Sequence, residues 1–298
     1  MDVVSLLQVG SAFLLNLGFT WLVGAWFARR WIQANGARRN DIDPELRRLD
    51  LWAAGLAACS SALALLAATA VMAGVGLGEA CPMFWMMLTS TAYGQAGCVT
   101  IAAMVTVLIL RWTVRGRGAE AGVAVALALF AVTRASMGHA GEAGLLSAAL
   151  AAEAVHYAAI GLWTGAVLLS GCYVLSERRI GQATVGASDR YLERMSQAAL
   201  AAVIAIFMTG VYSAWLRVGS AEHLQHTFYG VTLLIKVALV LLAIALGGYN
   251  KFFGLPAASR SQQGLRAVRT TLRLESAVLI SAVLAASILI SQTPPAAM

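Results

Sequence analysis

The sequence has few charged residues for its length. Of its 298 residues, 12% are charged and 60% are hydrophobic, whereas a soluble domain carries about 25% charged residues. A soluble protein of this size could not cover its surface with so few charges, but a surface that faces lipid needs almost none. The composition therefore excludes a soluble protein and predicts an integral membrane protein.

Several motifs of soluble functions are also missing. No two of the four cysteines are spaced as C-x-x-C, which excludes a thioredoxin motif and a zinc ribbon. Cys59, Cys98 and Cys172 lie inside apolar stretches, where a cysteine is expected to be a small packing residue. The sequence has no G-x-x-x-x-G-K-[ST] loop and no cytoplasmic segment large enough for an ATPase domain. We therefore expect a protein that is not an enzyme, and any transport to run downhill or to be coupled to an ion gradient.

The net charge of +7 does not predict a nucleic-acid partner. The basic residues form short clusters between apolar stretches instead of one continuous stripe. The first apolar stretch follows Asp2 and precedes Arg29 and Arg30, whereas a signal peptide carries its positive charge before the apolar core. We expect this stretch to be a retained helix whose N-terminus lies outside.

Eight apolar stretches are long enough to cross a bilayer, which takes about 20 residues of helix. They predict an all-α polytopic protein with one integral membrane domain over residues 1–298. Thr91-Ala-Tyr93-Gly94 and Thr227-Phe-Tyr229-Gly230 share three letters, which favours a 4+4 parallel repeat with halves 1–137 and 138–298. The predicted spans are 4–27, 51–77, 92–112, 119–137, 146–175, 196–218, 229–250 and 272–291.

The positions of the 21 basic residues predict the orientation of these spans. Only Arg134, Arg217 and Lys236 lie outside the four connections that run over 29–48, 111–117, 178–194 and 251–273. Cytoplasmic loops of membrane proteins are enriched in Lys and Arg. We therefore place these four connections in the cytoplasm and both termini on the periplasmic side, as in a multi-pass protein of the bacterial inner membrane.

The histidines gather in the connections that are predicted to lie outside. His139, His223 and His226 are three of the chain's four histidines, and all three lie there. Imidazole binds copper in either oxidation state, so this distribution predicts a copper site on the outer face. His223 and His226 are three residues apart and could share a metal ion only if their loop forms a helical turn.

Sulfur-containing residues lie on the same side. The first outer connection contains Cys81, Met83, Met86 and Met87, and Met137 precedes His139 by two residues. Soft sulfur ligands favour Cu(I), so these residues are candidate metal ligands. The alternative is that the methionines are adaptable packing residues at the interface, and it is the simpler interpretation of Met83, Met86 and Met87 taken alone.

A second group of polar residues lies inside the predicted spans. Glu153 and His156 are three residues apart and share one helix face, and Lys236 enters from the same side on the seventh span. Ionisable groups at this depth are costly and are usually paired or functional. The group therefore forms either a structural Glu153–Lys236 ion pair or a step on an ion path with His156 as a ligand. Glu275 is expected to form an interfacial pair with Arg273, or alternatively to line an exit.

The residues of the second half resemble, in their order and spacing, the bacterial copper-resistance protein D (CopD) family. The resemblance extends from about Arg134 to Pro295, and the first half offers only a matching number of spans. It rests on Gly138-His139-Ala140, His156, Trp163, Gly165, Thr209-Gly210, Thr227-x-Tyr229-Gly230, Lys236, Asn250, Glu275 and Pro294-Pro295.

The resemblance implies a function. Members of this family are thought to move copper across the inner membrane, often with a periplasmic copper carrier (CopC) as donor. It implies that His139 and His156 are functional histidines and that Lys236 and Glu275 are functional polar residues of the helices. Any CopC-like partner would be a separate chain, and membrane lipid is the other expected partner.

Two alternatives to a copper permease remain open. A haem-binding electron-transfer protein would need facing histidines at matched depths in different helices, and His156 is the one histidine predicted inside the membrane. A copper-binding assembly factor would bind the metal outside without moving it. The direction of transport and the oxidation state of the copper are also left open by the residues.

Overall fold

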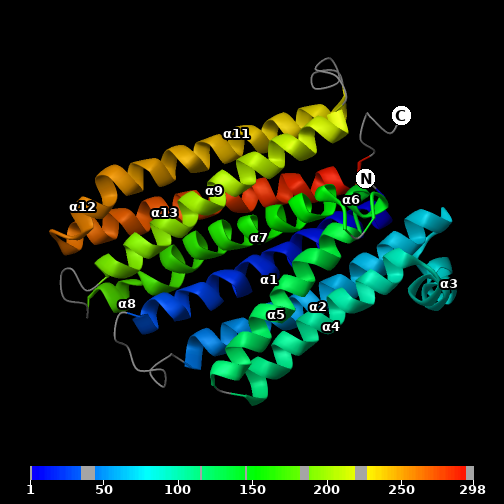
Figure 1. The fold of residues 1–298 in the computed structure, drawn as a ribbon, viewed down its shortest axis with the longest axis horizontal. Coiled ribbons are helices and arrows are strands. Elements are labelled where there is room, and N and C mark those ends of the chain that lie inside the picture. Colours follow the sequence, from blue (N-terminus) through cyan, green and yellow to red (C-terminus); the bar gives the residue numbers. More distant parts are fainter. Residues whose placement is uncertain are drawn as a thin grey trace.

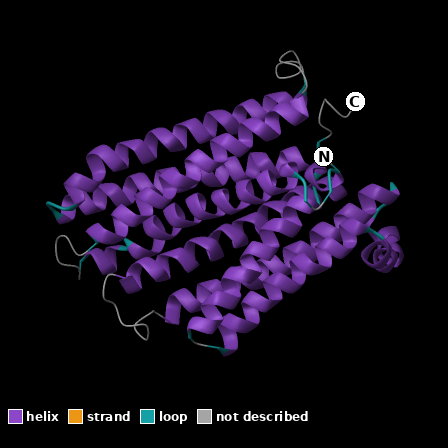
Figure 2. Ribbon diagram, in the orientation of Figure 1, coloured by secondary structure: helices purple, strands orange, loops and turns teal. Residues whose placement is uncertain are grey.

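The structure, a computed structural model of the chain, describes residues 2–34, 44–114, 116–144, 146–181, 188–218 and 227–292. Within these ranges it contains helices and no strands, and eight of the helices are long and apolar enough to cross a membrane. This confirms the predicted fold class and the number of spans (Figure 2). The eight are α1 (Val3–Ala34), α2 (Pro44–Ala73), α4 (Ala92–Thr113), α5 (Arg117–Ser136), α7 (Ala148–Leu169), α9 (Asp189–Val218), α11 (Phe228–Tyr249) and α13 (Gln262–Ile290).

Short helices lie between the spans. The π-helical turns η2 (Ser170–Val174) and η3 (Asn250–Gly254) extend α7 and α11. Figure 1 shows that α1 begins and α13 ends at the same end of the bundle, which we call the predicted outer end because the charge pattern places it outside. At this end lie α3 (Leu77–Ser90) and α6 (His139–Glu142), while α8 (Glu177–Ile180) and α12 (Leu255–Ala258) lie at the opposite, predicted inner end.

Three segments are more helical than predicted. Residues 78–91 were expected to be a connection, but α3 occupies almost all of it. The last span begins at Gln262 instead of residue 272, and its start is fixed by Ser261, whose hydroxyl accepts a hydrogen bond from the Gly264 backbone N–H at 3.0 Å. Likewise α9 begins at Asp189, before the predicted residue 196. Charged residues end the apolar stretch without ending the helix, because the backbone hydrogen bonds of a helix also form where the helix extends beyond the membrane into water.

The spans pack as two groups of four. The N-terminal group consists of α1, α2, α4 and α5, and the C-terminal group consists of α7, α9, α11 and α13. The two groups meet where α1 crosses α7, and there Gly24 lies against Gly165. A Cβ atom on Gly165 would stand 1.9 Å from the backbone oxygen of Thr20. Gly161 and Gly165 are spaced G-x-x-x-G, which allows two helices to approach closely, and α1 and α7 do so here.

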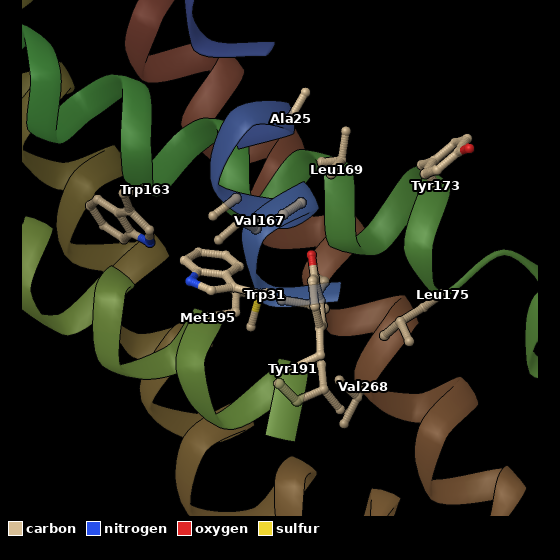
Figure 3. Packing of buried hydrophobic residues seen from close by; sticks show 14 of the residues in the cluster. Ala25, Trp31, Trp163, Val167, Leu169, Tyr173, Leu175, Tyr191, Met195 and Val268 are labelled. Atoms are coloured by element: carbon tan, nitrogen blue, oxygen red, sulfur yellow. The ribbon is translucent and has the colours of Figure 1, made fainter. Parts of the chain in front are cut away.

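Buried aromatic residues fill the interior on both sides of this crossing. In the N-terminal group, Phe19 stacks on Phe130 with a centroid distance of 4.5 Å. In the other cluster, Trp31 of α1 meets Tyr191 of α9 with a centroid distance of 5.8 Å, and Trp163 of α7 belongs to the same cluster (Figure 3). Helix α1 contributes to both clusters, so it forms the centre of the bundle.

The cysteines are not packing residues. All four are exposed, including Cys59, Cys98 and Cys172, so the expectation of small interior residues is wrong. An apolar span has one face toward the bundle and another toward lipid, and both faces are apolar. Composition therefore could not tell which face a cysteine occupies.

The two groups share one local feature and differ in their packing. Thr91 caps α4 and Thr227 caps α11, each hydroxyl accepting a hydrogen bond from the backbone N–H three residues later, at 2.9 and 3.0 Å. However, α2 packs along α4, whereas the corresponding helices α9 and α11 make few contacts with each other. The 4+4 repeat therefore stays a prediction that rests on the shared caps.

A buried ion network lies at the predicted inner end of the N-terminal group. Asp50 of α2 is fully buried and pairs with Arg29 of α1 at 2.5 Å and with Arg111 of α4 at 3.2 Å. Arg111 also pairs with Glu120 of α5, and the indole N–H of Trp21 donates to Asp50 at 3.2 Å. The sequence analysis placed Arg29 and Arg111 in cytoplasmic connections, but both lie inside helices and are buried. The network ties four helices together at this end.

Candidate metal sites and polar path

His156 is buried in the C-terminal group, between α7 and α9. It is 9% exposed, and its Nδ1 lies 2.9 Å from the hydroxyl oxygen of Thr209. The Thr209 hydroxyl oxygen also lies 2.6 Å from the backbone oxygen of Ala205. When the hydroxyl donates its proton there, its oxygen accepts from Nδ1–H of His156, and the opposite tautomer reverses that hydrogen bond.

Glu153 lies one turn before His156 and contacts the same helix. The hydroxyl of Ser213 donates to the Glu153 carboxylate at 3.3 Å, and Ser213 follows Thr209 by one turn of α9. Gly210 of α9 faces the His156 ring, because a Cβ atom there would be in ordinary van der Waals contact with it at 3.5 Å. The structure therefore confirms that Glu153 and His156 share one face, and it shows that this face meets polar residues of α9.

Glu275 is not the interfacial residue that was expected. It is 2% exposed, and its carboxylate accepts a hydrogen bond from the indole N–H of Trp163 at 2.9 Å. The predicted pair with Arg273 is therefore wrong. Helix α13 turns Glu275 toward α7 and α11, where Gly247 leaves room for the carboxylate. Trp163 packs in the core, and its contact with Glu275 could not be read from the sequence, because the two residues are far apart in the sequence.

Lys236 lies on α11 and is half-buried. Helix α11 packs mainly against α13 and has few contacts with α9. The pairing of Lys236 with Glu153 is not decided by the described contacts and stays a prediction.

The outer histidines are not brought together by the described residues. His139 is the first residue of α6, and its side chain is not described. His223 and His226 lie outside the described residues. Where side chains are described, no three His, Cys, Asp or Glu residues are grouped as a metal site.

Methionines do gather at the predicted outer end. Met83, Met86 and Met87 of α3, together with Met72 of α2, line a pocket of about 350 Å³. Met72 was missed in the sequence analysis, although it lies near the end of its span and a short turn connects it to the methionines of α3. A methionine just before a tight helix–helix turn was the signal that could have revealed it.

Two of the predicted sulfur ligands lie elsewhere. Cys81 does not line this pocket, and its thiol lies 3.4 Å from the backbone oxygen of Leu77. The sulfur of Met137 accepts weak hydrogen bonds from Thr100 at 3.8 Å and from the guanidinium of Arg134 at 3.9 Å. Because a buried cation touches its sulfur, Met137 is a poor ligand for a second cation.

Comparison with known families matches two parts of the chain. The family of copper resistance protein D-like N-terminal domains matches residues 2–148, and the family of copper resistance protein D matches residues 189–289. The first half, which carried no recognised motif in the sequence analysis, is therefore also of this kind. His139 lies in the first match and Glu275 in the second, whereas His156 and Trp163 lie between the two. Searches of the curated proteins and of the solved structures gave no match.

Proposed function

The chain belongs to the copper resistance protein D family, and from this premise we propose that it carries copper across the bacterial inner membrane. The family and the eight apolar spans make it a multi-pass membrane protein with a role in copper resistance. The proposed direction is uptake, from the predicted outer end to the cytoplasm. Copper is then the transported substrate, and the outer histidines and methionines are its first ligands.

The buried His156 carries this proposal. It lies eight residues into α7, about 12 Å below the start of that helix. One of its partners is the neutral hydroxyl of Thr209, 2.9 Å from Nδ1. A purely structural residue at this depth would not need a metal-binding nitrogen, and intramembrane ionisable residues commonly mark ion paths.

Other polar residues extend the proposed path in both directions. Glu153 lies one turn closer to the predicted outer end, and Glu275 reaches α7 at Trp163, two turns or about 10 Å further in than His156. Lys236 of α11 is proposed to neutralise a carboxylate of this path when copper is absent. Copper would therefore pass Glu153, bind His156 and leave past Glu275.

A periplasmic copper carrier of the CopC kind is the proposed donor. It would be a separate chain that delivers copper to His139, His223, His226 and the methionines near them. If the protein only binds copper for an assembly pathway, the outer ligands would still load but no metal would cross the membrane.

Copper uptake into proteoliposomes tests the proposal. We expect the wild-type protein to load vesicles with copper and His156→Ala to reduce the initial rate at least tenfold while its yield and unfolding temperature stay unchanged. The control is Val155→Ala on the same helix, because Val155 is next to His156 and is 49% exposed. A His156→Ala protein that loads copper at the wild-type rate would reject the path. A visible Soret band in the purified protein would instead support the haem-binding alternative.

A further inference from the structure

We propose that Met72, Met83, Met86 and Met87 form a thioether site that takes copper as Cu(I) at the predicted outer end. The inference deepens the proposed function, on which it rests for its role as the loading point, because it names the oxidation state of the copper. The site itself is argued from its own contacts and does not depend on transport.

A tight turn brings the four methionines together. Gly74 follows the end of α2 with a positive φ of 67°. Its N–H donates to Val71 O at 3.2 Å, and the N–H of Val75 donates to Ala70 O at 3.1 Å. This is a Schellman motif, and it turns the chain back at once, so that α3 packs beside the end of α2 that holds Met72.

Helix α3 then presents its methionines on one face. Met83, Met86 and Met87 are spaced i, i+3 and i+4, so their side chains lie on the same side of the helix. All three line the pocket together with Met72. Gly94 of α4 lets α3 pack closely against α4, because a Cβ atom there would stand 2.2 Å from the backbone oxygen of Met87.

Sulfur is the main donor type among the described residues of the pocket. Besides the methionines, its described lining residues are Thr69, Ala73, Ser90 and Thr91, so none of the described lining side chains is charged or an imidazole. The hydroxyl of Thr69 donates to Leu65 O at 2.9 Å, and that of Thr91 donates to Met87 O at 2.7 Å. Thioethers alone are soft ligands that select Cu(I) and disfavour Zn²⁺ or Mg²⁺.

The exposure of three of the methionines favours binding over packing. Met72, Met83 and Met86 are 61%, 40% and 63% exposed, so they do not fill a core, whereas Met87 is 6% exposed and packs with Leu65 and Ala68, which fixes its position. The pocket of about 350 Å³ is wider than one ion. Methionine has three rotatable bonds and adapts to irregular spaces, so the side chains are able to close around a single Cu(I).

Titration of the purified full-length protein with Cu(I), against a chromogenic Cu(I) chelator and under reductant, tests the site. A thioether does not bind protons in this range, whereas imidazole is largely protonated below its ordinary pKa of about 6.5. We therefore expect one equivalent of Cu(I) to stay bound at pH 5, where the histidine sites release theirs. Replacing the four methionines by leucine should remove this equivalent. Met208→Leu is the control, because Met208 is 66% exposed on α9 and lies outside the pocket.

Two further measurements keep the test decisive. If the fourfold variant fails to fold, the triple variant of the exposed Met72, Met83 and Met86 should weaken Cu(I) binding at pH 5 at least tenfold. X-ray absorption of the wild-type protein at pH 5 should show sulfur ligands around Cu(I). Nitrogen or oxygen ligands only, or an unchanged equivalent in the methionine variants, would overturn the site.

The failure of this site and the failure of transport are distinguishable. A wild-type protein that holds the pH 5 equivalent but loads no copper into vesicles would reject the transport proposal and keep the site. A methionine variant that retains the pH 5 equivalent while His156→Ala stops uptake would reject the site and keep transport.

Discussion

The two groups of spans bury their polar residues in opposite ways. In the N-terminal group, Asp50 is held between Arg29 and Arg111, so buried charges are matched by opposite charges at one end of the bundle. In the C-terminal group, His156 contacts the hydroxyl of Thr209 and Glu275 contacts the indole of Trp163. The first arrangement matches buried charges with opposite charges, and the second places a neutral hydroxyl or indole against an imidazole and a carboxylate, the groups of the proposed path.

This difference indicates different roles. A charge that is paired with a fixed opposite charge contributes to one structure and is poorly able to bind a passing ion. A buried imidazole or carboxylate with a neutral partner keeps its affinity for a cation. The packing agrees with this division. In the N-terminal group α2 lies along α4, whereas in the C-terminal group α9 and α11 make few contacts with each other. We infer that the N-terminal group is the scaffold and that the C-terminal group contains the path.

The largest expected effect is the loss of the scaffold's ion network. Asp50→Asn removes the carboxylate between Arg29 and Arg111 and leaves buried guanidinium groups without it, which should cost about 3–5 kcal/mol. Thermal unfolding in detergent measures this. The control is Glu177→Gln, whose pair with Arg269 at the predicted inner end is exposed on the Glu177 side and should cost about 0–1 kcal/mol. Equal effects of the two substitutions would contradict a structural role for the network.

A smaller effect is expected where the two groups meet. Gly165→Ala places a methyl group 1.9 Å from Thr20 O, so α1 and α7 must move apart. Forced overpacking of this kind costs about 1–3 kcal/mol. Gly55→Ala on α2 is the matched control, because its added Cβ meets nothing within 4 Å. If both variants unfold at the wild-type temperature, the close crossing is not needed to join the groups.

The smallest effect on stability, and the sharpest test of the comparison, is expected at Glu275. Glu275→Gln keeps an oxygen that accepts from the Trp163 indole, so the unfolding free energy should change by about 1 kcal/mol or less. Copper uptake into proteoliposomes should nevertheless fall at least tenfold, because the amide is a weak cation ligand. Trp163→Phe removes the hydrogen bond and keeps the carboxylate. It should lower the unfolding free energy more than Glu275→Gln does, and reduce the rate of copper uptake less than Glu275→Gln does. A Glu275→Gln protein with normal uptake would make Glu275 part of the scaffold.

Much of the fold was predictable because lipid allows little choice of backbone. Apolar stretches gave the eight spans, and their composition was enough because every backbone hydrogen bond must be made inside a helix. The wrong predictions concern which helix face a residue occupies and where a helix begins. Cys59 lies in a span as expected but faces outward, and α13 begins before its apolar stretch. Neither detail follows from hydropathy, because it does not distinguish lipid from protein interior.

The candidate sites were likewise predictable only in part. The sequence alone determined that Glu153 and His156 share a face, since helical periodicity requires it. It also showed that methionines and histidines gather in the connections that are predicted to lie outside. Only the tertiary structure decided that Glu275 lies against Trp163, that Arg29 and Arg111 share Asp50, and that Met72 joins the methionines of α3. These contacts depend on the packing and rotation of separate helices, which is set by close small-residue crossings such as Gly24 with Gly165 and by tight turns such as Gly74. Local pattern specifies the helix and its residues, and packing between helices specifies which of those residues meet.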